Sequence, residues 1–273
     1  MKKLVIGGLL LASPVMALAE GTPWLAIPGE TSLQLSTVFQ STDAFRQNDD
    51  KNQLPADLDL DTIWLSLTHG ISDNLAVDFR TGYAESDFAP VGEESGRTDT
   101  TLGLTWRFVD EFLSAGNVPS AAVRVAAIFE GNYDPKGVNA IGDGASGLEA
   151  SIILGKAFTD RFALSGDLGY RYRQGDVPNE VTFNLGAYYS FSQSLSASVG
   201  YHNTNSRGDL DIGAPGFSPA RFPETEEDIE SFDVSLTYNF TPSINMALSY
   251  GSVIDGQNTP DNDIYAVSLG VSF

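Results

Sequence analysis

The 273-residue sequence predicts an all-β fold, a transmembrane antiparallel up-and-down β-barrel of about 12 strands, within a range of roughly 10 to 14. Three observations predict it. Segments of roughly ten residues alternate apolar with polar or small side chains. Tight turns alternate with long polar connections along the chain. Beyond the first residues, no stretch approaches the roughly 20 apolar residues that a membrane-spanning helix needs.

The start of the chain has the pattern of a secretory signal. Lys2 and Lys3 precede an apolar run, which is followed by the small-residue sequence Ala17-Leu18-Ala19. We therefore expect an exported protein whose mature chain begins at Glu20. The predicted organisation is a cleaved signal peptide at 1–19, a periplasmic N-terminal segment at 20–30 and a transmembrane barrel at 31–273.

Alternation of side chains defines the strands and their two faces. In the segment 161–173, Leu164, Leu168 and Tyr170 fall on one face, whereas Asp167 and Arg171 fall on the other. Charged groups inside hydrocarbon are costly, so the second face should line a wet lumen. The same pattern predicts strands at 31–40, 61–69, 74–84, 99–108, 120–130, 146–158, 161–173, 180–191, 194–204, 230–240, 243–254 and 263–273.

The connections predict which end of the barrel faces the periplasm. Tight sequences such as Ser72-Asp73-Asn74 and Thr241-Pro242-Ser243 are typical of periplasmic turns. One connection at that end, Val109 to Ser120, is long, and we expect a short helix in it. The long polar connections, which should face outward, lie at 41–60, 85–98, 131–145, 205–229 and 255–262.

The last strand ends on an aromatic residue, and its alternate side chains are hydrophobic. This pattern resembles the signal that the barrel-assembly machinery recognises, which makes that machinery an expected partner. The same residues can also belong to an aromatic girdle at the membrane surface. The side chains that carry the signal are Tyr265, Val267, Leu269, Val271 and Phe273.

Composition excludes several classes of function. The chain has 15 Lys and Arg against 36 Asp and Glu, a formal net charge of −21, so nucleic-acid binding is not expected. It has no cysteine, and its acidic runs at 209–213 and 224–228 lack the spacing of a calcium loop. We expect no metal site and no cofactor. The acidic loops are either solvated or bridged by divalent cations to lipopolysaccharide, and we expect a monomer.

The inward face predicts the residues of a solute path. Its ionisable side chains could create a transverse field that orients a polar solute, or they could pair with one another and fill the lumen. The sequence leaves both alternatives open. The candidate residues are Asp78, Arg80, Arg107, Arg124, Glu149, Asp167, Arg171, Arg173, Tyr188 and Asp233.

Two histidines raise the question of catalysis. His69 lies beside a tight turn and is interpreted as a residue of the interfacial girdle. The run from His202 to Arg207 loosely resembles a stretch of outer-membrane phospholipase A, with Thr204 where that family has its nucleophilic serine. Alternation places His202 and Thr204 on the lumen side, whereas a phospholipase site must meet lipid. The sequence therefore favours a protein that is not an enzyme.

From Thr98 to about Phe191, the sequence resembles the outer-membrane transporter family associated with meta-pathway phenol degradation. The resemblance implies a small outer-membrane channel for aromatic or other hydrophobic nutrients, with no catalytic residue to transfer. A structural or adhesive barrel with a closed lumen, acting through its acidic loops, is the alternative; a lipid-active enzyme around His202 is a remote one. The matching segments are 99–108, 131–134, 142–144, 160–162, 168–173 and 175–180.

Overall fold

The computed structural model describes residues 21–48 and 50–273, so the expected signal peptide at 1–19 and its cleavage point before Glu20 lie outside the described residues. The described chain is almost entirely strand, with one short 3-10 helix, η1, at Pro219–Glu224. The strands are β1 Thr31–Gln47, β2 Asp50–Ser72, β3 Leu75–Phe88, β4 Gly92–Arg97, β5 Thr100–Val109, β6 Ser120–Phe129, β7 Gly147–Ala157, β8 Phe162–Arg173, β9 Asn179–Ser190, β10 Leu195–Arg207, β11 Asp228–Thr241, β12 Ile244–Gln257 and β13 Asp263–Ser272.

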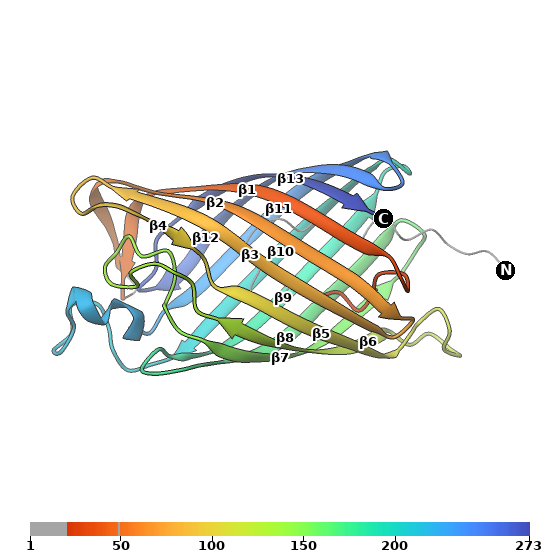
Figure 1. Ribbon diagram of the computed structural model, residues 1–273, viewed down its shortest axis with the longest axis horizontal. Coiled ribbons are helices and arrows are strands. Elements are labelled where there is room, and N and C mark those ends of the chain that lie inside the picture. The colour runs from red at the N-terminus through yellow and green to blue at the C-terminus, as the bar shows by residue number, and fades with distance from the viewer. Residues whose placement is uncertain (1–20, 49) are drawn as a thin grey trace.

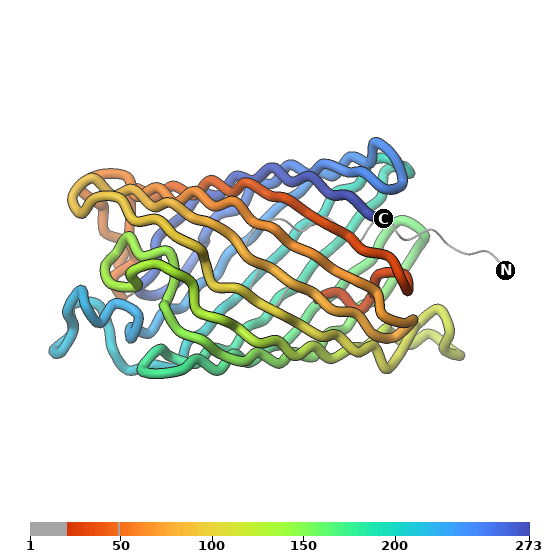
Figure 2. The backbone as a smooth tube through the Cα atoms, in the orientation of Figure 1, coloured from red at the N-terminus to blue at the C-terminus, as the bar shows by residue number. Residues whose placement is uncertain are grey.

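The strands form a closed barrel. Successive wall strands pair antiparallel, and β1 pairs with β13 to close the sheet. Of the 13 strands in the described chain, β4 pairs only with the outer half of β3, so the wall itself has 12 strands. The predicted fold and strand number are confirmed. Figures 1 and 2 show the tilted strands wrapping around a common axis.

The two ends of the barrel differ. One end, called here the turn end, carries the start of β1, the end of β13 and the short connections (Figure 1). The opposite end, the loop end, carries the long connections. At the turn end, the connection from 110 to 119 forms turns, in which the backbone N–H groups of Leu113 and Ser114 donate to Asp110. The expected helix is wrong, because Gly116 adopts a positive φ of 90° and Pro119 follows it.

The outer and inner faces have the expected chemistry. In β8, Leu168 is 57% exposed, whereas its neighbour Asp167 is 5% exposed. The four alternate hydrophobic side chains of β13, from Tyr265 to Val271, lie on the exposed face, and Phe273 directly after the strand is also exposed. An apolar exterior around a polar interior is the arrangement of a transmembrane barrel. Among residues 21–48 and 50–273, no helix is long and apolar enough to cross a membrane.

The loop end is more regular than expected. The segments 41–60 and 85–98 were predicted as loops, but β1 continues to Gln47, β2 begins at Asp50 and β4 lies within 92–97. Outward side chains in these extensions are polar, such as Asp57 and Asp59, so the hydrophobic alternation ends while the backbone pairing continues. Hydrophobic pattern marks only the part of a strand that faces hydrocarbon.

The N-terminal segment 21–30 folds into the mouth of the barrel at the turn end. Gly29 N donates to Gly70 O at 2.7 Å, next to a parallel bridge between Pro28 and Gly70. Further in, Trp24 is 7% exposed and its ring meets that of Tyr188 edge-on at 6.2 Å. This segment therefore narrows the lumen at the turn end.

Candidate functional site

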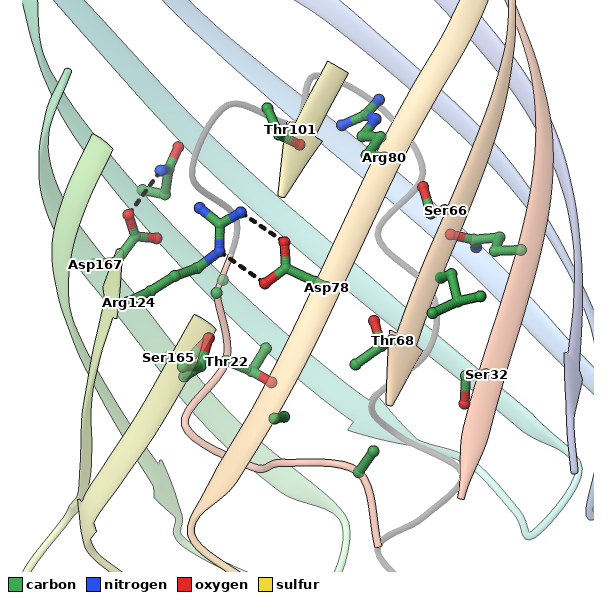
Figure 3. Close-up of a pocket in the computed structure, with 18 of the residues that line it drawn as sticks. Thr22, Ser32, Ser66, Thr68, Asp78, Arg80, Thr101, Arg124, Ser165 and Asp167 are labelled. Atoms are coloured by element: carbon green, nitrogen blue, oxygen red, sulfur yellow. Dashed lines mark hydrogen bonds and ion pairs between the residues drawn. The ribbon is translucent and has the colours of Figure 1, made fainter. Parts of the chain in front are cut away.

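The lumen contains a cavity of about 400 Å³, which is the candidate site (Figure 3). Its lining comes from most of the wall strands and from residues 21–27 of the N-terminal segment. A volume of this size lies within the range of small-molecule sites. Among the residues that the structure describes, no group of His, Asp and Glu side chains is arranged to hold a metal ion.

A continuous chain of ion pairs crosses one side of the lumen. Arg124 donates to both oxygens of Asp78, at 3.0 and 2.6 Å, and to Glu149 at 2.6 Å. Arg171 donates to Glu149 at 2.9 and 3.1 Å and also pairs with Glu180. These five side chains alternate in charge, and we call them the ion-pair wall. Figure 3 shows its first link, between Arg124 and Asp78.

Strand register explains why the ion-pair wall is continuous. Glu149 of β7 lies opposite Arg171 of β8, which lies opposite Glu180 of β9. Arg124 must reach across β5 to Asp78, and Gly103 leaves the space. A Cβ atom at Gly103 would lie 2.4 Å from Asp78 Oδ1 and 2.6 Å from Arg124 Nη2. The glycine is therefore required by close packing of two charged side chains.

A second cluster of charges lies toward the loop end. Arg173 donates to Asp99 at 2.9 Å and to Asp143 at 3.2 Å. Tyr133 of the β6–β7 loop donates its hydroxyl to Asp99 at 2.6 Å. Burial raises the pKa of Asp143 to about 6, although the Arg173 guanidinium lowers it. Arg173 thus anchors the β6–β7 loop to the barrel.

A third cluster joins four neighbouring strands, β8 to β11. Asn184 donates its amide to Asp167 at 3.0 Å, so its oxygen faces His202 Nδ1 at 2.9 Å. His202 Nε2 lies 2.7 Å from Asp233. Both ring nitrogens are therefore held by hydrogen-bonding partners on neighbouring strands. A histidine held in this way inside the lumen is poorly placed to activate Thr204 as a lipase nucleophile.

The opposite side of the lumen carries hydroxyl groups. Three pairs of serine side chains are hydrogen-bonded across neighbouring strands, and Ser66 and Thr68 of β2 line the cavity beside them. We call the six paired serines the hydroxyl wall. The pairs are Ser32 with Ser272 at 3.0 Å, Ser36 with Ser268 at 2.8 Å and Ser235 with Ser249 at 2.6 Å.

Three other candidate residues lie apart from these clusters. The Arg80 guanidinium lies over the Trp64 ring, 4.0 Å from its centroid, and lines the cavity. Tyr188 also lines the cavity, with its hydroxyl 3.1 Å from that of Ser165. Arg107 lies at the turn end instead, where it donates to Asp73 O at 2.6 Å and pairs with Asp110 at 2.8 Å. It binds a turn and does not line the cavity.

Sequence reasoning missed several functional positions. Trp64 shares a strand face with Ser66 and Thr68, so alternation could have identified it. Glu180 was placed at a strand end, and Asp99 and Asp143 fall at or beyond strand ends, where alternation carries no information. Trp24 precedes the first strand, and nothing local in the sequence indicates that the segment turns back into the barrel.

The loops fold together at the loop end. Asn258, with a φ of 52°, accepts hydrogen bonds from Asn48 N at 3.1 Å and Ile212 N at 3.3 Å. Its amide donates to Asp211 at 3.0 Å. The hairpin loop of β1 and β2, the β10–β11 connection and the β12–β13 connection are thus joined at one side chain. Burial raises the pKa of Glu227, in the same connection as Asp211, to about 8.

Comparisons with known proteins agree with this architecture. A family model described as "Putative MetA-pathway of phenol degradation" matches residues 34–269. The chain belongs to this family. No curated protein matches the sequence. The matched residues run from β1 into β13 and include the lumen clusters described above except the Ser32–Ser272 pair.

Solved structures share the fold of this family member at low sequence identity. An outer membrane channel from Pseudomonas putida F1 aligns with a TM-score of 0.73 and 16% identity over 94% of this chain and 100% of that one. The NanC porin aligns with a TM-score of 0.58 and 8% identity over 88% and 98%. The KdgM porin aligns with a TM-score of 0.52 and 10% identity over 88% and 99%.

Proposed function

We propose that this protein is an outer-membrane channel that passes small solutes, aromatic or hydrophobic ones among them, into the periplasm. The observation that carries the proposal is the cavity of about 400 Å³ inside a closed wall whose exterior is apolar. Membership of a phenol-degradation family supports an aromatic solute. In this proposal the path is shaped by Asp78, Arg80, Arg124, Glu149, Asp167, Arg171, Arg173, Tyr188 and Asp233, while Arg107 supports the turn end.

The proposal includes a route to the membrane and an orientation in it. Residues 1–19 act as a cleaved signal peptide, and the final strand is recognised by the barrel-assembly machinery. The turn end then faces the periplasm and the loop end faces outward. Outward carboxylates above the apolar belt, such as Asp59 of β2 and Asp87 of β3, lie directly opposite each other and suit contacts to lipopolysaccharide through divalent cations. The barrel acts as a monomer.

The proposed channel performs no chemistry. The contacts of His202 support this, because Asn184 and Asp233 hold its two nitrogens within the lumen. Release of fatty acid from phospholipid vesicles provides the check. Purified wild-type protein should release none, and release that disappears in His202→Ala would contradict the proposal.

Single-channel recording in planar bilayers tests the channel directly. The wild-type barrel should give unitary conductance steps, and liposomes that contain it should swell in small polar solutes. Replacing Arg171 and Arg173 together with alanine removes two cations from the lumen, so selectivity should shift toward cations. An unchanged selectivity and conductance would remove these residues from the constriction.

A closed-lumen barrel that acts through its loops is a second candidate, and one observation favours it. Residues 21–27 occupy the mouth at the turn end, where Pro23 is fully buried and Trp24 contacts Tyr188. A lumen closed in this way predicts no conductance steps and no swelling in any solute. The recordings therefore separate the two candidates.

A further inference from the structure

The β5–β6 connection, residues 110–119, differs from the other connections at the turn end. It is the longest of them in the described chain, and none of its residues lines the cavity. In Figure 1 it projects from the turn end beside β5 and β6. Residues 112–119 of this connection carry no charged side chain, although the whole chain has a formal net charge of −21.

Three apolar side chains of this connection are exposed. Leu113 is 81% exposed, the highest value of any large hydrophobic residue in the described chain, and Phe112 beside it is 50% exposed. Val118, near the start of β6, is 38% exposed. Exposed apolar side chains grouped in one segment mark a contact with a protein or with a membrane.

The two carboxylates at the base of the connection are bound by the barrel. Asp110 pairs with Arg107 at 2.8 Å. The Glu111 side chain is 3% exposed; it accepts the Trp24 indole N–H at 3.0 Å and pairs with Lys156 at 3.3 Å. These contacts fix the base of the connection at the rim and match its negative charges within the protein. The tip therefore presents apolar groups without an unpaired carboxylate to repel lipid phosphates.

The outer face of the barrel is apolar on both sides of the connection. On β5, Trp106 and Phe108 are each 49% exposed, and their ring centroids are 5.7 Å apart. Directly after β7, Phe158 is 58% exposed. The nearby Lys156 Nζ donates to Val118 O at 3.1 Å, which ties the connection to the end of β7. The connection is therefore continuous with the lipid-facing exterior, at the level where aromatic side chains meet the membrane surface.

We propose that the tip of the β5–β6 connection, Phe112 and Leu113, inserts into the phospholipid leaflet at the turn end and anchors that end of the barrel. The proposal goes beyond solute passage and rests only on the barrel spanning a membrane. Apolar side chains gain free energy on leaving water. A protein partner contacts polar groups around an apolar centre, whereas residues 112–119 offer only the polar side chains of Ser114 and Asn117. Lipid is therefore the better match.

A nitroxide label measures the depth of the tip directly. Because the chain has no cysteine, each of Leu113→Cys, Leu168→Cys and Asp160→Cys carries one label in phospholipid vesicles. Oxygen concentrates in hydrocarbon and a polar nickel complex stays in water, so the ratio of their collision rates reports immersion. The ratio at residue 113 should lie near that at residue 168, which is 57% exposed on the outer face of β8. It should exceed the ratio at residue 160, in the tight turn between β7 and β8.

The two reference labels separate the possible failures. A ratio at residue 113 equal to that at residue 160, with a high ratio at residue 168, would overturn the anchor and leave the tip to a soluble partner. The barrel would still span the membrane in that case. A low ratio at residue 168 would instead refute the membrane-spanning barrel, and the anchor with it.

A second measurement tests whether lipid contact at the tip stabilises the barrel. Leu113 is so exposed that Leu113→Ser removes little packing within the protein. In lipid vesicles it should lower the ratio of folded to unfolded barrel about tenfold, because one apolar side chain no longer leaves water. Val91→Ser is the matched control, since Val91 is 61% exposed in the β3–β4 connection at the loop end. It should leave the ratio unchanged. Urea titrations that give the same ratio for both variants would contradict insertion of the tip.

Discussion

The ion-pair wall and the hydroxyl wall join neighbouring strands by different interactions. In the ion-pair wall, charged side chains form ion pairs between β3, β6, β7, β8 and β9. In the hydroxyl wall, neutral serines form hydrogen bonds between β1, β11, β12 and β13. In the ion-pair wall Arg124 and Arg171 share the carboxylate of Glu149, whose side chain is 5% exposed. In the hydroxyl wall each contact joins two hydroxyls: Ser268 donates to Ser36, and in the other two pairs either hydroxyl can donate.

This difference determines how each wall responds to change. Removing one member of the ion-pair wall leaves a charge without its counter-charge in a largely enclosed position, which is strongly destabilising. A hydroxyl can exchange donor and acceptor roles, so its loss costs only the weak net energy of a neutral hydrogen bond. Substitutions in the ion-pair wall should therefore be strongly destabilising, whereas substitutions in the hydroxyl wall should cost little stability.

The largest expected effect comes from Glu149→Gln. The substitution keeps the shape of the side chain but leaves Arg124 and Arg171 facing each other without the central carboxylate. We expect a loss of about 3 kcal/mol in the free energy of unfolding, measured by urea titration in lipid vesicles. Glu93→Gln, in the exposed part of β4, should have almost no effect. Equal stability of the two variants would show that the fold does not depend on the carboxylate at the centre of the ion-pair wall.

The second largest effect is expected in the N-terminal segment. This segment lies against the side of the lumen formed by β7 to β9. Trp24 donates its indole N–H to Glu111 at 3.0 Å and packs on Gly155 and Tyr188. Trp24→Ala should weaken docking of the segment by about 2 kcal/mol, which raises the undocked population roughly 30-fold and increases mean conductance. Trp106→Ala changes a 49% exposed tryptophan on the outer face and is the control. Conductance that is the same in both variants would contradict a docked segment that narrows the lumen.

Two carboxyl groups at the loop end differ in the same way, because one has a charged partner and the other a neutral one. Asp143 pairs with Arg173 and its pKa rises only to about 6, whereas Glu227 is bonded to the Thr259 hydroxyl and its pKa rises to about 8. A raised carboxyl pKa means that the closed loops favour the neutral form. Their stability is highest in acid, falls as pH rises above the ordinary pKa of about 4.5 and is lowest above pH 8.

Conductance recorded from about pH 5 to about pH 9 should therefore rise as the loops loosen. Glu227→Gln should remove the part of this rise between pH 6 and pH 8, because an amide does not ionise. Asp143→Asn should keep that part and reduce the rise below pH 6, to which Glu227 also contributes. A rise between pH 6 and pH 8 that survives in Glu227→Gln would exclude Glu227 as its source.

The smallest effect is expected from the hydroxyl wall. Ser36→Val leaves the Ser268 hydroxyl without this partner and should cost about 1 kcal/mol of unfolding free energy. Replacing both serines with valine removes the unmatched hydroxyl, so stability should return to near the wild-type value. Urea titration of the single and double variants provides the measurement. A double variant that is less stable than the single one would show that the hydroxyl wall depends on specific bonds.

Alternation in the sequence was sufficient to predict the fold, because each wall strand carries hydrocarbon-facing residues at every second position. The same alternation placed Asp78, Arg124 and Arg171 inside the lumen, and the structure has them there. It left open whether lumen charges pair, since pairing depends on register, and register can be seen only once Glu149 lies opposite Arg171.

Other parts of the site depend on interactions that alternation does not encode. Trp24 reaches Tyr188, a contact that joins the chain start to β9. Arg107 has the correct parity for the lumen, but its position at the end of β5 brings it to Asp110 instead. The extensions of β1 and β2 lie beyond the hydrocarbon, so their outward residues give no apolar signal.

The pairing of β1 with β13 also affects the rate at which the barrel folds. Ser32 and Ser272 are 240 residues apart in sequence, yet their hydroxyls meet in the closing seam. Contacts of such separation form slowly, since the whole intervening chain must be brought together first. Until the final strand arrives, two edges with unsatisfied backbone groups would face lipid, a state that hydrocarbon does not tolerate. Assembly is therefore all-or-none, and a ribosome that stops before β13 leaves a chain that cannot insert.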